Sequence, residues 1–379
     1  MRTTTTIGRI ALSPPFGLAP LAGLTDTAFR RLVKRNGGCA LVVTEMINAE
    51  GLVRGQDRTL EYAEFTEEER PVATQIFGGD PERMAEAARL VESIGADIVD
   101  VNMGCPVPKI ARGNAGCLLM REPGRAAAIV SAMARAVRIP VTVKMRTGWD
   151  DNGIVAPDFA KKMEDAGAAA VTVHGRTGVQ AYRGSSDWDV IARVARSVTI
   201  PVFGNGDCIE PGQVVGRWRE SGVAGVLVGR GVVRNPWLLA QAGELADGRP
   251  ARPVTAEDRA RFLLEYIDLL VGGTAAGPEG ARRGAWPAAH LRGAGNVRRR
   301  TTRSRATATP GDHERWVVGK VRGLAAWYTR GLESGSRFRV AVNQAGSVGQ
   351  IRDTVQLFFA GSSDRGPAGR PTPDANLRV

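Results

Sequence analysis

Eight short apolar segments, each rich in β-branched residues, recur along the first part of this 379-residue chain and constrain its fold more than any other feature. Each segment is nearly continuous rather than alternating, which is typical of parallel strands that are buried on both faces. We therefore expect eight parallel strands. The segments are residues 17–23, 40–46, 71–78, 97–104, 140–148, 169–177, 201–207 and 224–231.

Stretches with helical periodicity separate these segments. Residues 26–36 open with Asp26 as a candidate N-cap, and a second stretch opens with Asp80 and stops at Gly95. Strand and helix alternate eight times, which is the count of a closed (β/α)8 barrel, the TIM barrel. An open doubly wound sheet is the alternative, but it usually carries a GxGxxG turn after its first strand, and APLAGLTD does not match that turn. The predicted fold class is therefore α/β, a TIM barrel followed by a small C-terminal helical domain.

The pattern changes beyond residue 245. We expect residues 1–245 to form the catalytic barrel and residues 246–360 to form the helical domain. Residues 278–313 are rich in Gly, Ala, Arg and Pro and show little periodicity, which predicts a flexible insert between helices. Residues 361–379 are typical of a disordered tail. The helices expected in the second domain are 255–273, 319–332 and 347–359.

The net charge of +12 is unevenly distributed. Between residues 280 and 330 there are twelve Lys or Arg residues and only two acidic residues, so most of the excess lies in one late segment. A basic segment of this kind suits a nucleic-acid partner. A solvated, partly disordered arginine-rich insert is the alternative, and the two interpretations stay equally open at this point.

Composition argues against a membrane protein, a secreted protein and a metal-binding protein. No apolar run approaches the roughly 20 residues that cross a bilayer, so we expect no membrane association. The first residues lack the apolar core and cleavage site of a signal peptide. Four cysteines without CxxC spacing are typical of reduced thiols, so we expect a cytoplasmic protein, and we expect it to be a monomer. The three histidines have no ligand-like neighbours, so we expect no metal.

Polar and ionisable residues stand near the end of almost every predicted strand. In such barrels the active site lies at the C-terminal ends of the strands, where packing alone would favour apolar residues. A lone buried histidine is more often a hydrogen-bonded core residue than a ligand, so the inference rests on the coincidence of many polar residues at one rim. The residues concerned are Glu45, Gln75, Asn102, Cys105, Lys144, Arg146, His174, Arg176, 204–207 and 229–231.

The glycine turns after the last two strands indicate a phosphate site. Barrels of this class frequently bind phosphate there, because glycines let main-chain N–H groups approach an anion and Arg230 adds a forked donor. Lys144 would supply a fixed positive charge for the electron-rich edge of a reduced flavin, and Gln75 a hydrogen bond to the pyrimidine side of its ring. FMN, a flavin that ends in phosphate, fits this set better than NAD, which would need the dinucleotide fingerprint.

Cys105 is then interpretable as a proton donor. A thiol has an unperturbed pKa of about 8.5, so it is mostly protonated at neutral pH and can give its proton to a substrate that lies on the flavin. Asn102 offers a donor and an acceptor suited to the amide-like edge of a base. Filling space is the alternative role for a cysteine, and we interpret Cys39, Cys117 and Cys208 in that way.

Several motifs together resemble those of the tRNA-dihydrouridine synthases, most closely the bacterial B-type branch. The resemblance runs from residue 14 to residue 242. It implies an FMN-dependent reduction of specific uridines in tRNA to 5,6-dihydrouridine, with NADPH as the reductant, hydride transfer from flavin N5 to uracil C6 and protonation of C5 by Cys105. It also implies that the helical domain holds the tRNA body. The motifs are APLAGLTDTAFR, TEM, QIFGGDPERMAEAA, DVNMGCPVPKI, VTVKMRTGWDD, VHGRTGVQAYRGSSDW, PVFGNGD and GVLVGRGVVRNPWL.

The resemblance assigns roles residue by residue. Asn102, Arg176 and Arg183 would face the RNA base. The residues that would bind FMN are Pro20, Leu21, Ala22, Gln75, Lys144, His174, Asn205, Gly206, Asp207, Gly229 and Arg230.

The chain also departs from the family pattern. Leu21 stands where Met is usual, Gly178 where a basic residue is common and Cys117 where a small residue is usual, and the insert at 278–313 is atypical. Two rival functions stay open. An FMN barrel enzyme that reduces a free pyrimidine or an enone would not need the basic second domain. An RNA-binding or chaperone-like protein that keeps the barrel as a scaffold would not need the proton donor or the phosphate turns.

Overall fold

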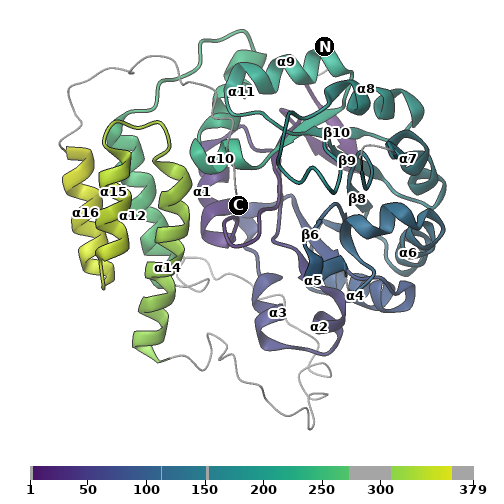
Figure 1. Ribbon diagram of the computed structural model, residues 1–379, viewed down its shortest axis with the longest axis horizontal. Coiled ribbons are helices and arrows are strands. Elements are labelled where there is room, and N and C mark those ends of the chain that lie inside the picture. The colour runs from purple at the N-terminus through teal and green to yellow at the C-terminus, as the bar shows by residue number, and fades with distance from the viewer. Residues whose placement is uncertain (1–2, 112, 151–152, 273–308, 361–379) are drawn as a thin grey trace.

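The computed structural model describes residues 3–111, 113–150, 153–272 and 309–360. At its centre a closed parallel barrel is surrounded by helices (Figure 1). The barrel strands are β3 (Phe16–Leu18), β4 (Leu41–Val43), β6 (Val72–Phe77), β7 (Ile98–Met103), β8 (Val141–Arg146), β9 (Ala170–His174), β10 (Val202–Asn205) and β11 (Gly225–Val228). β3 pairs with both β4 and β11, and β4 pairs with β6, so the sheet closes on itself. The predicted barrel is confirmed, and the open sheet is excluded.

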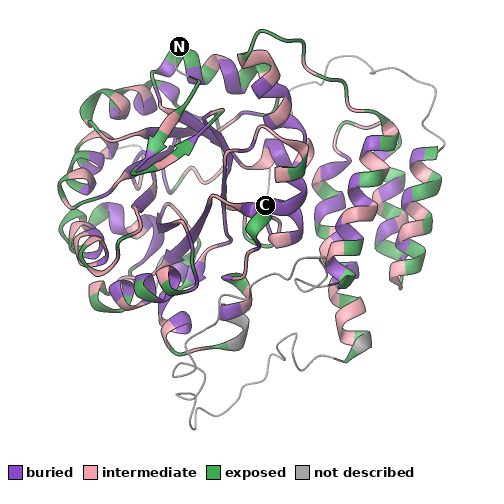
Figure 2. Cartoon of the chain, turned by 180° about the vertical axis from the view of Figure 1, so that it is seen from behind, coloured by how far each residue is buried: buried purple, intermediate pink, exposed green. Residues whose placement is uncertain are grey.

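Amphipathic helices follow the strands and cover the outside of the barrel. The Asp26 side chain accepts from the Phe29 N–H at 3.0 Å, and Asp80 accepts from the Arg83 N–H at 2.9 Å, so both expected N-caps are present. The helices turn their apolar faces inward, which leaves the purple, buried surfaces of Figure 2 between strands and helices. These helices are α1 (Thr27–Asn36), α4 (Pro81–Ser93), α6 (Pro123–Ala136), α7 (Ala156–Asp165), α8 (Trp188–Ser197), α9 (Pro211–Ser221), α10 (Arg230–Arg234) and α11 (Leu238–Ala246).

Shorter elements that the sequence analysis did not anticipate complete the barrel. The antiparallel pair β1 (Thr5–Ile7) and β2 (Ile10–Leu12) buries Ile7 and Leu12 in one cluster with Ile98, at the beginning of β7. This hairpin therefore closes the N-terminal end of the barrel and leaves the opposite end for chemistry. The remaining elements are β5 (Ile47–Asn48), α2 (Ala49–Val53), α3 (Asp57–Tyr62), η1 (Glu67–Glu69), α5 (Pro108–Ala111) and η2 (Gly116–Arg121).

Among the described residues, four helices form a unit that packs against one side of the barrel (Figure 1): α12 (Ala256–Gly272), α14 (Pro310–Tyr328), α15 (Gly335–Gln344) and α16 (Val348–Ala360). Phe262 of α12 lies at the centre of the junction. Its ring lies edge-on to Phe29 of α1 at 5.9 Å between centroids and stacks on Tyr328 of α14 at 5.6 Å. An aromatic contact of this kind fixes the helical unit on the barrel wall.

The predicted insert and tail lie largely outside the described residues. The structure does not describe residues 273–308 and 361–379. The flexible insert and the disordered tail therefore stay predictions, and so do the domain boundaries. α14 begins at Pro310, with Thr309 as its N-cap, so residues 310–313 are helical although the sequence analysis assigned them to the insert.

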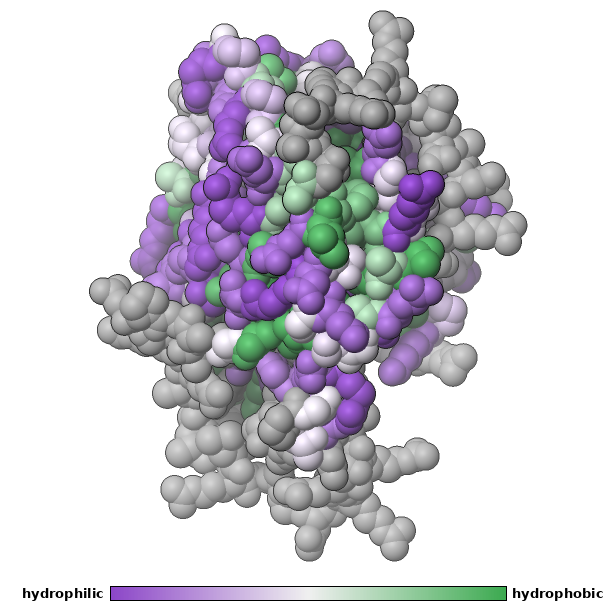
Figure 3. Space-filling model, turned by 90° about the vertical axis from the view of Figure 1, so that its left-hand side faces the viewer, coloured by the Kyte–Doolittle hydropathy of each residue, from purple (hydrophilic) through white to green (hydrophobic). Residues whose placement is uncertain are grey.

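The outward face of the helical unit is mixed in polarity. Figure 3 shows apolar side chains among polar ones on this face. Val340 of α15 and Leu357 of α16 are 56% and 77% exposed. Within the described residues, none of the helices combines the length and the apolar character needed to cross a bilayer.

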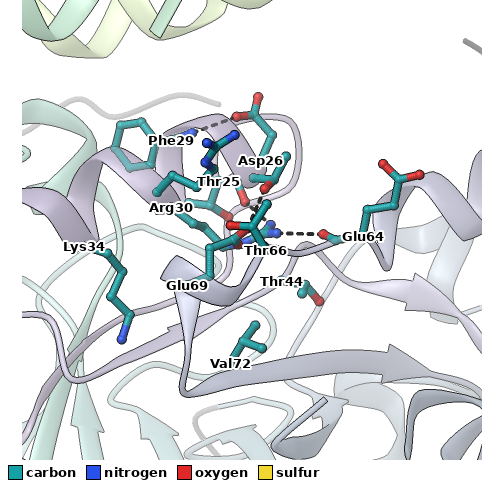
Figure 4. Close-up of polar contacts among 12 residues, drawn as sticks. Thr25, Asp26, Phe29, Arg30, Lys34, Thr44, Glu64, Thr66, Glu69 and Val72 are labelled. Carbon is teal, nitrogen blue, oxygen red and sulfur yellow. Dashed lines mark hydrogen bonds and ion pairs between the residues drawn. The ribbon is translucent and has the colours of Figure 1, made fainter. Parts of the chain in front are cut away.

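A buried ion pair joins α1 to the turn before β6. Arg30 Nε donates to Glu69 Oε2 at 2.6 Å, and the two side chains are 2% and 0% exposed. The other Arg30 nitrogens donate to the carbonyls of Thr25 and Glu64 (Figure 4). Glu69 Oε1 accepts from the main-chain N–H of Thr66. Because each side-chain nitrogen of Arg30 and each carboxylate oxygen of Glu69 has a hydrogen-bond partner, the core tolerates both charges.

We expect Glu69→Gln to lower the free energy of unfolding by about 3 kcal/mol, because it leaves the Arg30 charge buried without a counter-ion. Urea unfolding followed by circular dichroism measures the change. Arg35→Met is the matched control, because it breaks a half-exposed pair with Glu68, and its cost should stay below about 1 kcal/mol. Equal effects of the two substitutions would contradict the importance of the buried pair.

Candidate functional site

Strand register brings the predicted site residues together at the C-terminal rim of the barrel. Asn102 on β7 lies beside Lys144 on β8, and His174 on β9 lies beside Asn205 on β10. Lys144 Nζ then reaches Asn205 Oδ1 at 3.4 Å across the barrel mouth. These side chains come from separate strands, so the rim exists as a site only in the closed barrel.

A chain of buried hydrogen bonds runs from Asp100 to the cysteine turn. Asp100 Oδ2 accepts from Gln75 Nε2 at 2.7 Å, and Gln75 Oε1 accepts from Asn102 Nδ2 at 2.8 Å. Asn102 Oδ1 accepts from the main-chain N–H groups of Gly104 at 3.2 Å and Cys105 at 2.9 Å. The order of donors and acceptors fixes the orientation of both amides. Asn102 therefore shapes the turn that presents Cys105.

Two further hydrogen bonds hold this turn from outside. Arg146 Nε donates to the Gly104 carbonyl at 2.7 Å, and the Cys117 N–H donates to the Cys105 carbonyl at 2.9 Å. Arg146 is only 3% exposed, and its Nη1 also donates to the carbonyls of Thr177 and Ala181. One guanidinium thus ties the turn after β7 to the loop after β9.

Cys105 is a partly buried thiol in an electropositive setting. Burial raises its pKa, while a backbone N–H at Val107 and the charges of Arg146 and Lys144 act in the opposite direction. The net shift is upward, so the thiol is protonated at neutral pH and is available as a proton donor.

Positive charge is concentrated at this rim. Burial, followed by repulsion from Arg146, lowers the pKa of Lys144 to about 8. Burial and the nearby cations, including Arg176 and Arg230, hold the pKa of His174 well below its ordinary value, so that ring is neutral. A site with this charge distribution favours an anion.

The turn after β10 forms a cradle with Arg230. Gly206 has φ of +136°, and a Cβ there would lie 2.1 Å from Ser186 Oγ, so only glycine fits. Asp207 accepts from Arg230 Nη2 at 3.3 Å and from Arg176 Nη2 at 2.7 Å. Among the described residues none accepts a hydrogen bond from the buried Nη1 of Arg230. An unpaired buried guanidinium N–H beside a glycine turn fits a phosphate oxygen.

Two of the three predicted substrate residues are engaged within the protein. Arg176 is 2% exposed, and its donors reach the carbonyls of Arg183 and Gly184 as well as Asp207. It holds the loop after β9 in place, as Asn102 holds the turn after β7. Arg183 is exposed at the rim and donates to the Val179 carbonyl at 2.9 Å. The roles of all three toward a base stay predictions.

The sequence analysis missed two contributors. Asp100 lies inside the strand segment 97–104 and is buried. Its signal in the sequence was its own position, as a carboxylate in the middle of an apolar run. The Tyr182 ring lies under the Arg230 guanidinium, 4.4 Å from the ring centroid to Cζ, and no spacing in the sequence indicated that contact. In the described part of the chain, no group of three or more potential metal ligands comes together.

The geometry of this rim can now be compared with known proteins. A family model described as "Dihydrouridine synthase (Dus)" matches residues 17–308. The chain belongs to the dihydrouridine synthase family. The predicted resemblance is therefore confirmed, and so is the prediction that the chain is an enzyme of this family, an oxidoreductase.

Curated members of this family match most of the chain. A probable tRNA-dihydrouridine synthase of Rickettsia bellii is 36% identical over 363 residues, which cover 95% of this chain and 99% of that protein. A probable tRNA-dihydrouridine synthase of Rhodobacter capsulatus is 41% identical over 71% of this chain and 83% of that protein. tRNA-dihydrouridine synthase B of Xanthomonas campestris is 38% identical over 70% of this chain and 80% of that protein.

The lowered pKa of Lys144 makes the stability of this synthase depend on pH. Between about 8 and the ordinary 10.5, the unfolded chain binds more protons at this residue than the folded chain, so the lysine's contribution to stability rises with pH. We expect cofactor-free Lys144→Met to be more stable than the wild type at pH 7, with an advantage that shrinks toward pH 10.

Urea unfolding at pH 7, 8, 9 and 10 measures this difference. Lys162→Met, on the exposed face of α7, controls for the loss of one positive charge. If the difference in free energy of unfolding between Lys144→Met and the wild type stays constant over this range, burial does not lower the pKa of Lys144.

Proposed function

We propose that this dihydrouridine synthase reduces specific uridines in tRNA to 5,6-dihydrouridine, with FMN as its cofactor and NADPH as the reductant. The observation that carries the proposal is the protonated Cys105 thiol, which a hydrogen-bonded turn presents beside Lys144 at an electropositive barrel mouth. The names of the relatives, which specify tRNA, support the choice of substrate.

The residues at the rim fit FMN. Its phosphate would lie against the turn at Gly206 and take the free N–H of Arg230. Lys144 would lie beside the ring and offset negative charge on it, and Gln75, whose amide is oriented by Asp100, would meet its pyrimidine side. When bound, FMN would supply the hydride that passes from its N5 to C6 of uracil.

Cys105 completes the reduction by giving its Sγ proton to C5 of uracil. The thiolate that remains is stabilised by the positive charges of Arg146 and Lys144, which act against the burial that otherwise disfavours it. Because Cys105 is only partly buried, a solvent proton can restore the thiol. Hydride and proton together saturate the C5–C6 bond, and NADPH replaces the electrons.

The helical unit would hold the body of the tRNA. Residues 309–360 carry seven Lys or Arg residues against four acidic residues, and the segment before them is more basic still. Phosphate contacts from such cations position a nucleic acid without reading its sequence. Arg176 and Asn102 would then act on the base mainly through the loops that they hold, and Arg183 from the exposed rim.

An absorbance spectrum of the purified protein, followed by addition of NADPH and then unmodified tRNA, tests the whole proposal. We expect a flavin spectrum that NADPH bleaches and tRNA restores, with dihydrouridine appearing in the RNA. Flavin that bleaches but does not respond to tRNA would favour an enzyme acting on a free pyrimidine or an enone. Protein that binds tRNA but no FMN, even after reconstitution, would favour the RNA-binding scaffold.

Cys105→Ala should lower the rate of flavin reoxidation by tRNA about 100-fold or more, because the proton donor is lost. Flavin binding and its reduction by NADPH should not change. Cys39→Ala is the matched control, since it removes a buried thiol at the far end of β4 and should keep full activity. A fully active Cys105→Ala enzyme would refute the role of the thiol.

Residues Arg298 to Arg300 lie outside the described residues, but their positive charge leads us to expect that they contribute to tRNA binding. Replacing all three with Gln should weaken tRNA binding and flatten its dependence on salt, because fewer counter-ions are released from the RNA. Filter binding at several salt concentrations measures both quantities. Unchanged affinity and slope would show that the insert takes no part in binding.

A further inference from the structure

Lys320 of α14 reaches from the helical unit into the barrel mouth. Its Nζ lies 3.0 Å from Asp26 Oδ2 and 3.6 Å from Glu45 Oε1, and it donates to the Gly23 carbonyl at 3.3 Å. The lysine side chain is 15% exposed, and the two carboxylates are 9% and 6% exposed. A cation from the helical unit thus lies between two buried carboxylates of the barrel and offsets part of their charge.

Two of the three partners of Lys320, Gly23 and Asp26, belong to the loop between β3 and α1, and the third, Glu45, follows β4. Gly23 lies in this loop with φ of +83°, and its N–H donates to Glu45 Oε2 at 2.6 Å. The Leu21 N–H donates to Thr25 Oγ1 at 2.9 Å. A Cβ on Gly229 would lie 3.4 Å from the Leu21 side chain, so this loop touches the turn after β11 next to Arg230.

The carboxylates depend on Lys320 for their charge balance. Burial acts to lower the pKa of Lys320, but Asp26 and Glu45 outweigh it and the net shift is upward. Asp26 Oδ2 also accepts from the Tyr266 hydroxyl at 2.9 Å. Among the described residues none donates a hydrogen bond to the buried Oε1 of Glu45, and the nearest cation to that atom is Lys320.

A loss of the Lys320 charge would therefore disturb the conformation of the β3–α1 loop. Two desolvated carboxylates would remain with no cation between them, and a buried charge without a counter-ion is strongly unfavourable. Glu45 can relieve this by taking up a proton or by turning toward water, and turning would break its hydrogen bond with the Gly23 N–H. The same movement would shift Leu21 away from Gly229.

We propose that Lys320 is a positioning residue through which the helical unit orders the β3–α1 loop over the cofactor site. The helical unit is then a structural part of the flavin site as well as a platform for RNA. This inference rests on the proposed function, since it assumes that the loop containing Leu21 contacts FMN.

The dissociation constant for FMN, measured by quenching of flavin fluorescence on the full-length protein, tests the inference. We expect Lys320→Met to bind FMN about tenfold more weakly than the wild type. Arg315→Met is the matched control, because it removes a positive charge from the exposed start of the same helix and should leave the affinity unchanged.

A second substitution separates positioning from a general loss of structure. Glu45→Gln in the Lys320→Met background removes the unbalanced anion while a side-chain oxygen can still accept from the Gly23 N–H, so most of the affinity should return. A rescue of this kind is not expected if Lys320→Met merely unfolds the helical unit. If Lys320→Met leaves FMN affinity unchanged, or if the double variant binds no better than the single one, the inference is wrong.

The same measurement distinguishes this inference from the proposed function. A wild-type protein that binds no FMN after reconstitution would overturn the proposed function and the inference with it. A wild-type protein that binds FMN, with a Lys320→Met variant of equal affinity, would overturn the inference alone.

Discussion

Closure of the parallel sheet is the constraint on which the rest of the molecule depends. The pairing of β4 with β6 closes it, so all eight parallel strands end at one rim. The register then decides which side chains meet there, and it places Asn102 beside Lys144 and Arg146 beside His174. A shift of one residue in any of these pairings would turn the polar side chains away from one another.

The rim gathers more positive charge than its own carboxylates balance. Arg146, Arg176, Arg230 and Lys144 all act on the neutral His174, while Asp207 carries the ion pairs of two of the arginines. Like charges held in a partly dry site destabilise the fold, and an anion bound only to the folded state offsets this cost. The arrangement thus lowers the stability of the protein alone, and under the proposed function a phosphate-bearing ligand would offset that cost.

The sequence was most informative where local patterns decide structure. The eight strand segments, the caps at Asp26 and Asp80 and the polar residues at the strand ends all follow from period, capping chemistry and chain order. The β1–β2 hairpin was missed because a threonine-rich segment gives no apolar run, and its role depends on what it covers. Asp100 and Tyr182 were missed because their contacts join residues that only the closed barrel brings together.

The loops of the rim differ in where their support comes from. The turn after β7 is held by Asn102 and Arg146, and the loop after β9 by Asp207 and Arg176, all of them barrel residues. The β3–α1 loop instead draws a cation from α14, far along the chain. This contact couples the stability of the loop to that of the helical unit, because a substitution that removes either side leaves the other with an unpaired buried charge.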